Sequence, residues 1–137
     1  MFADCDDIGG NNVVSRNGLP LSGSQEVPPV VTEASGEAKV SYNKKTKVLR
    51  YTLTWEDLSG NPTGAHIHGE AARGENAGVK HNFTDDLPKE KSGTFTNSVV
   101  VDEVGINEKD LLNGLYYFNI HTPEHPAGEI RGQIEFK

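Results

Sequence analysis

Two neighbouring stretches, GEAKVSY (36–42) and VLRYTLTW (48–55), alternate apolar and polar side chains with the period of a β-strand. Successive side chains of an extended strand point to opposite faces, so each stretch presents one apolar face and one polar face. The polar residues 43–46 between the two stretches are typical of a turn. The sequence therefore predicts a β-hairpin with one face against a core and the other in water.

The length and composition indicate one domain of the all-β class. A chain of 137 residues can bury one sizeable core. The hydrophobic fraction is only 34%, and the 15 glycines and 7 prolines favour many short strands with turns between them. The first residues are too polar to contribute to a core. We therefore expect a flexible leader over residues 1–18 and a folded domain over residues 19–137.

Further strands are predicted on both sides of the hairpin. The proline-containing segment 19–31 suits an edge strand or a covering loop, because proline has no amide donor. Residues 70–77 are expected to form a loop over the surface, and residues 107–114 form one short helix with Asn107 as its cap. The remaining predicted strands cover residues 63–69, 79–83, 93–101, 115–121 and 129–136. About eight antiparallel strands then form a sandwich or flattened barrel.

The charge of the chain restricts its partners. A net charge of −7 repels phosphate backbones and anionic lipids, so nucleic acids and membrane surfaces are poor partners. No apolar run approaches the length of a transmembrane helix. Cys5 is the only cysteine and excludes an internal disulfide; it is either an incidental tail residue or a site of lipid attachment. Exposed apolar side chains on an edge strand could pair two copies as a homodimer.

Three histidines are expected on strand faces that point away from the core. His66 and His68 lie on one side of their strand, while Ile67 points into the core. In the strand 115–121, Tyr116, Phe118 and Ile120 take the core face, which leaves Tyr117, Asn119 and His121 on the opposite face. In the last strand Ile130 and Ile134 take the core face and leave Glu129, Arg131 and Gln133 outside it. We therefore expect these polar side chains to converge on one exposed face.

This pattern predicts a metal site, with a simpler alternative for each histidine. Three neutral imidazoles without a thiolate or carboxylate suit copper best and zinc second. His66 and His68 could instead be solvated surface residues, and His121 a hydrogen-bonded residue at the rim. His81 is expected at the edge of the core, and His125 in a plain loop, although either could supply a fourth ligand. Glu129 and Arg131, two positions apart, are expected to form an ordinary ion pair.

Four motifs together resemble the CHRD (chordin) domain family. They are LSGSQEVPPV (21–30), GAHIHG (64–69), NIHT (119–122) and GEIRGQI (128–134). The resemblance extends from about residue 19 to the C-terminus. It implies a CHRD domain in a protein that is exported to the extracellular space, the periplasm or the cell surface.

A more distant resemblance connects the same residues to copper/zinc superoxide dismutases. Those enzymes also have a Gly-x-His-x-His strand, a later strand that ends in a copper-binding histidine, and an active-site arginine. The resemblance implies a Greek-key, superoxide-dismutase-like sandwich with His66, His68 and His121 as copper ligands, and His81 as the counterpart of the bridging histidine. Arg131 would be the catalytic cation that attracts superoxide, a small anionic substrate.

Two functional hypotheses follow. The first is an exported metal-binding protein, copper first, which in its enzymatic form is a copper-only superoxide dismutase. The zinc loop and the disulfide of the dismutases have no counterpart in this sequence, so a second, zinc-only site is not expected. The alternative is a non-catalytic extracellular module for protein interaction, in which the histidines are structural or incidental.

Overall fold

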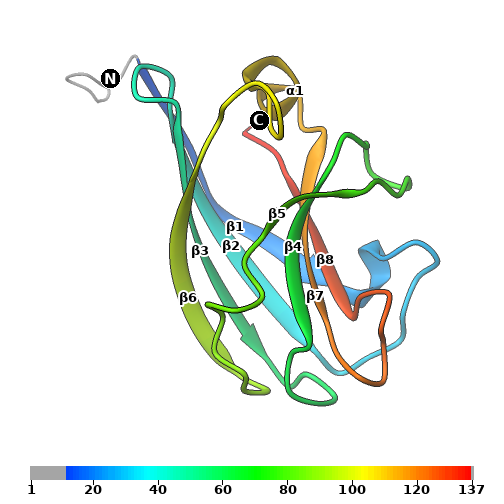
Figure 1. The fold of residues 1–137 in the computed structure, drawn as a ribbon. Helices are drawn as coiled ribbons and strands as arrows, with labels where there is room; N and C mark the ends of the chain where they lie inside the picture. The colour runs from blue at the N-terminus through cyan, green and yellow to red at the C-terminus, as the bar shows by residue number, and fades with distance from the viewer. Residues whose placement is uncertain (1–11, 137) are drawn as a thin grey trace.

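Eight antiparallel strands build the fold in the computed structural model, which describes residues 12–136 (Figure 1). The strands, one 3-10 turn and one helix are β1 (Val13–Ser22), η2 (Gly23–Gln25), β2 (Ser35–Asn43), β3 (Val48–Glu56), β4 (Gly64–Gly69), β5 (Val79–Asn82), β6 (Gly93–Val100), α1 (Glu108–Leu112), β7 (Tyr116–His121) and β8 (Ile130–Ile134). This architecture confirms the predicted all-β sandwich or flattened barrel with one short helix.

The sheet consists of two halves with a narrow junction. The strand order is β5-β4-β7-β8-β1-β2-β3-β6. We call β5, β4, β7 and β8 the β4 half, and β1, β2, β3 and β6 the β2 half; Figure 1 shows them on opposite sides of the core. Between β1 and β8 the ladder has a single pair, Ser22 with Arg131. The sheet therefore bends sharply at this junction and folds back on itself.

The core forms where the apolar faces of the two halves meet. Strand alternation in the predicted hairpin buries one face, with Tyr42, Leu49, Tyr51, Leu53 and Trp55 at most 1% exposed. Tyr51 packs against the other half, with its ring centroid 5.1 Å from that of Phe83 and 5.2 Å from that of Phe118. Aromatic contacts at this spacing add to the free energy gained by burying the rings.

The first strand starts earlier than the sequence predicts. β1 begins at Val13, whereas order was expected from Leu19, and Val13 pairs with Asn43 across the ladder to β2. Strand pairing satisfies the hydrogen bonds of backbone N–H and C=O groups whatever the side chains are. The polar composition of residues 13–18 therefore led to a wrong prediction of where the first strand begins. β1 also lies between β2 and β8 and is therefore not an edge strand. Cys5 and the rest of residues 1–11 lie outside the described residues.

Helix α1 has the predicted N-cap residue and the predicted glycine just after its C-terminus. Asn107 Oδ1 accepts a hydrogen bond of 2.9 Å from the amide of Asp110, and Gly114 adopts a left-handed conformation with φ of 76° just after the helix. Both are common signals of helix ends. Within residues 12–136, no helix is long and apolar enough to cross a membrane.

Gly132 permits the close approach of β8 to β1 at the junction of the two halves. A Cβ atom at this position would lie 2.5 Å from Leu21 Cδ2 and 2.5 Å from the carbonyl oxygen of Pro20. The second atom belongs to the backbone and cannot turn away as a side chain can. The junction therefore depends on the missing side chain.

We expect Gly132→Ala to lower the free energy of unfolding by about 1–3 kcal/mol, the usual cost of overpacking a core. Urea unfolding followed by tryptophan fluorescence measures the change. Gly78→Ala is the matched control, because a Cβ at Gly78 meets no atom within 4 Å. Equal unfolding midpoints for the two variants would contradict the argument.

Candidate functional site

Three histidines from two paired strands form one cluster. β4 pairs with β7 so that Gly64 lies opposite His121 and His66 lies opposite Asn119. The structure brings His66, His68 and His121 together, with one ring nitrogen of each within 4.8 Å of the others. His66 Nδ1 and His121 Nε2 are 3.1 Å apart. We call these three residues the histidine cluster.

Backbone carbonyls fix the outer nitrogen of two rings. His68 Nδ1 donates to the carbonyl oxygen of Ala77 at 2.9 Å, and His121 Nδ1 donates to that of Pro126 at 2.8 Å. A carbonyl oxygen only accepts, so each neutral ring carries its proton on Nδ1 and a lone pair on Nε2. Both Nε2 atoms face the inside of the cluster. Outer hydrogen bonds of this kind orient imidazoles that bind metals.

The surroundings of the cluster favour neutral imidazoles. Burial, together with the smaller effects of the neighbouring His121 and His68, lowers the pKa of His66 to about 4. Burial also lowers the pKa of His121, against a smaller opposing effect of the Pro126 carbonyl. Metal binding requires deprotonated ligand nitrogens. His66 and His121 meet that requirement near neutral pH.

The donor set fits a transition-metal ion that prefers nitrogen. Copper and zinc both accept neutral imidazole ligands. Bonds of about 2.0–2.1 Å keep two ligand nitrogens no more than about 4.2 Å apart. A spacing of up to 4.8 Å therefore requires one ring to move slightly. The cluster is close to, but not yet at, the spacing of a bound ion.

A loop covers the polar face that was expected to be exposed. Residues 70–78, the covering loop, lie over the outward side chains of β4, β7 and β8. Arg131 stacks on Tyr117 with its Cζ 3.5 Å from the ring centroid, and it donates to Asn76 Oδ1 at 3.1 Å. His68 stacks on Tyr117 in turn, with centroids 4.9 Å apart. Arg131 is 1% exposed, so the polar face around it is buried and not exposed as the sequence predicted.

Two buried polar residues at the cluster are not among the site residues predicted from the sequence. Asn119 Oδ1 lies 2.8 Å from His68 Nε2 and 2.9 Å from His121 Nε2. Glu26 is 6% exposed, and its Oε2 has no hydrogen-bond partner. Strand alternation placed Asn119 on the same face as His121, as the structure has it, but gave it no role in the site. Glu26 follows a 3-10 turn in a proline-rich segment, where no periodicity indicates its position.

Burial raises the pKa of Glu26 to about 7. Arg131 and the Asn119 amide lower it, but by less than burial raises it. The amide acts on Glu26 although Oε2 itself makes no well-formed hydrogen bond. Near neutral pH this carboxyl group is therefore close to its midpoint of protonation.

The other two histidines lie outside the cluster. His81 Nε2 is 3.1 Å from the Tyr51 hydroxyl, and its ring is 5.6 Å from that of Phe83, at the edge of the core. Burial lowers its pKa. His125 lies in the loop before β8, with Nε2 3.7 Å from Glu124 Oε1. A ligand role for either residue stays a prediction that the geometry does not favour.

Glu129 does not form the predicted ion pair with Arg131. Its carboxylate accepts hydrogen bonds from the Ser59 and Thr122 hydroxyls, each at 2.8 Å, and from the Thr32 hydroxyl at 2.5 Å. Burial alone would raise its pKa, but these hydrogen bonds outweigh burial and lower it. Glu129 therefore connects three loops by hydrogen bonds. Strand alternation placed it beside Arg131 but could not predict partners that come from distant loops.

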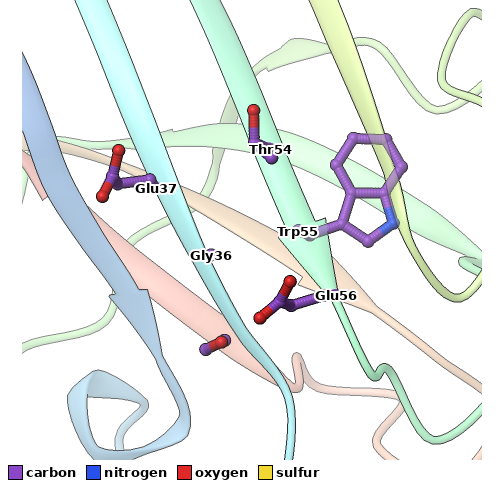
Figure 2. Close-up of a pocket in the computed structure, with 6 residues that line it drawn as sticks. Gly36, Glu37, Thr54, Trp55 and Glu56 are labelled. Atoms are coloured by element: carbon purple, nitrogen blue, oxygen red, sulfur yellow. The ribbon is translucent and has the colours of Figure 1, made fainter.

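The surface has two hollows to consider. One lies beside the polar face that carries the histidine cluster, and the other lies away from it. One of about 360 Å³ is lined by Glu26, Arg131 and Gln133 among others, and so borders the polar face. Another of about 280 Å³ lies in the β2 half between the ends of β2 and β3, where Figure 2 shows Glu37, Thr54 and Glu56 around it. The second hollow contains no histidine.

Comparison with known proteins identifies the domain. The model of the CHRD domain matches residues 18–134. The chain belongs to the CHRD domain family. Chordin from Danio rerio is 32% identical to this CHRD domain over 123 residues, which are 85% of the chain. The matched part is 12% of that relative, and no solved structure matches. These matches confirm the CHRD resemblance and do not support the superoxide dismutase resemblance.

Because the pKa of Glu26 is raised in the folded state, we expect the folded state to become less stable as pH rises. The folded state holds the proton up to about pH 7, whereas the unfolded carboxyl loses it near its ordinary pKa of 4.5. The folded state thus binds more protons between these values, and stability falls as pH rises through them. Glu26→Gln removes this dependence, which amounts to no more than about 3.5 kcal/mol.

Urea unfolding of both proteins at several pH values between 4.5 and 8 measures this effect. The comparison of the two proteins isolates Glu26 from the other titratable groups of the chain. The same pH dependence in both proteins would contradict the assignment.

Proposed function

We propose that this chain is a non-catalytic interaction module that works outside the cell. The similarity to Chordin over 85% of the chain carries this proposal. Since the chain spans only 12% of that relative, the proposal concerns the domain and not the activity of the whole relative. The net charge of −7 favours a cationic or neutral protein surface as the partner.

The outer face of β3 and β6 is the surface we assign to a partner. Two pairs of threonine hydroxyls bridge the strands, Thr52 with Thr96 at 2.8 Å and Thr54 with Thr94 at 3.2 Å. Cross-strand pairs of this kind hold side chains in fixed positions. This face lies on the β2 half, away from the covering loop. It offers a partner ordered hydroxyl groups at little further cost in side-chain entropy.

We expect Thr52→Arg and Thr96→Arg to weaken partner binding by at least about tenfold, because a bulky cation replaces a paired hydroxyl. Cross-linking of the exported protein on intact cells identifies the partner, and surface plasmon resonance with the purified partner measures affinity. Thr63→Arg, an exposed position outside this face, is the matched control. Failure to cross-link any protein, or equal affinity for all variants, would contradict the proposal.

A second candidate function is the binding of copper, or zinc as second choice, by the histidine cluster. The observation that favours it is the convergence of three ring nitrogens, two of which have their outer nitrogen fixed by a carbonyl. Bound copper would supply redox chemistry and extend this candidate to superoxide dismutation. The burial of Arg131 weighs against its predicted role as a catalytic cation that draws an anion from solvent.

We expect the double substitution His66→Ala and His68→Ala to abolish stoichiometric copper binding, because only one imidazole of the cluster is left. Isothermal titration calorimetry and elemental analysis measure the bound copper. His81→Ala and His125→Ala are controls that remove an imidazole outside the cluster. Unchanged affinity in the double variant would rule out the site, and a superoxide assay before and after copper loading tests the enzymatic extension.

A further inference from the structure

The inside of the histidine cluster contains an oxygen atom as well as nitrogen atoms. Asn119 Oδ1 lies within 2.9 Å of both His68 Nε2 and His121 Nε2. The carbonyls of Ala77 and Pro126 hold the ring protons on the outer side, so both Nε2 atoms present lone pairs. Three electron-pair donors, two nitrogens and one oxygen, thus face one another at hydrogen-bond distance. A shared cation would stabilise this arrangement.

The nitrogen of the same amide points toward Glu26. A Cβ atom on Gly128 would lie 2.6 Å from Asn119 Nδ2 and 2.4 Å from Glu26 Oε2, so both atoms border the space over Gly128. Glu26 Oε2 is buried and has no hydrogen-bond partner. A buried acceptor without a partner costs free energy. A small shift of the amide toward Glu26 would satisfy both groups.

The charges of the site give Glu26 a second role. Imidazole binds a metal ion in its neutral form, so a ligand set of three imidazoles and one amide leaves the charge of a divalent ion uncompensated. Glu26 is the carboxylate on the far side of the Asn119 amide. Arg131 is the cation that acts electrostatically on the Glu26 carboxylate. Carboxylates behind a ligand orient it and increase its electron donation. Asn119 connects this carboxylate to the cluster.

We propose that Asn119 Oδ1 is the fourth ligand of a cation held by His66, His68 and His121, and that Glu26 positions the Asn119 amide. The site is then an N3O site for a transition-metal ion. This inference rests on the second candidate function above. Asn119 is a direct ligand, whereas Glu26 acts through Asn119.

The experiment compares variants of equal size in Co²⁺ and Cu²⁺ titrations of the full chain at pH 8. Asn119→Asp keeps an oxygen ligand, so we expect it to bind the ion more tightly than Asn119→Leu does. Asn119→Leu removes the oxygen and should weaken affinity by roughly 100-fold, and Glu26→Gln by roughly 10-fold. The visible absorption of the Co²⁺ complex, which reports the ligand set, should change in Asn119→Leu and stay unchanged in Glu26→Gln.

The controls separate the possible failures. Asn113→Leu removes an exposed amide at the end of α1, outside the cluster and the covering loop, and should leave affinity unchanged. Circular dichroism checks the fold, and Asn119→Asp keeps the test valid if Asn119→Leu does not fold. Absence of binding in the parent refutes the metal site itself. Binding in the parent with equal affinity and spectra in all Asn119 variants overturns only the ligand role of Asn119.

Discussion

The polar face of β4, β7 and β8 must find its hydrogen-bond partners without open water, and the covering loop supplies them. Ala77 accepts from His68, Asn76 and Glu75 accept from Arg131, and Ala71 accepts from Gln133. A buried polar group left without a partner costs about 1–3 kcal/mol. The covering loop is therefore an integral part of the fold, and the orientation of His68 depends on it.

Strand alternation accounts for much of what the sequence could predict. It placed Ile67 in the core, gave His66, His68 and His121 a common side, and identified the hairpin from Gly36 to Trp55. It failed where contacts come from distant segments. Tertiary packing determines the contacts of the covering loop, the buried position of Glu26 and the three hydroxyl groups that donate to Glu129. A two-residue periodicity carries no information about such contacts. The early start of β1 depends on backbone pairing with β2 and not on its polar side chains.

The two candidate functions use different parts of the molecule. The histidine cluster lies on β4 and β7 beneath the covering loop, whereas the threonine pairs lie on the outer face of β3 and β6. Membership in the CHRD family and the similarity to Chordin support the interaction module. The cluster geometry supports a bound ion independently of that similarity. A cation in the β4 half would stabilise the fold by mass action without contact with a partner on the β2 half.

The position of β6 at the end of the strand order has a consequence for the behaviour of the protein in concentrated solution. Its eight residues, GTFTNSVV (93–100), include no lysine, glutamate or proline, the residues that commonly protect strand edges. Its outer edge is a ready template for a further strand. The excess negative charge of the chain keeps copies apart, so high ionic strength would screen that repulsion and promote aggregation along β6.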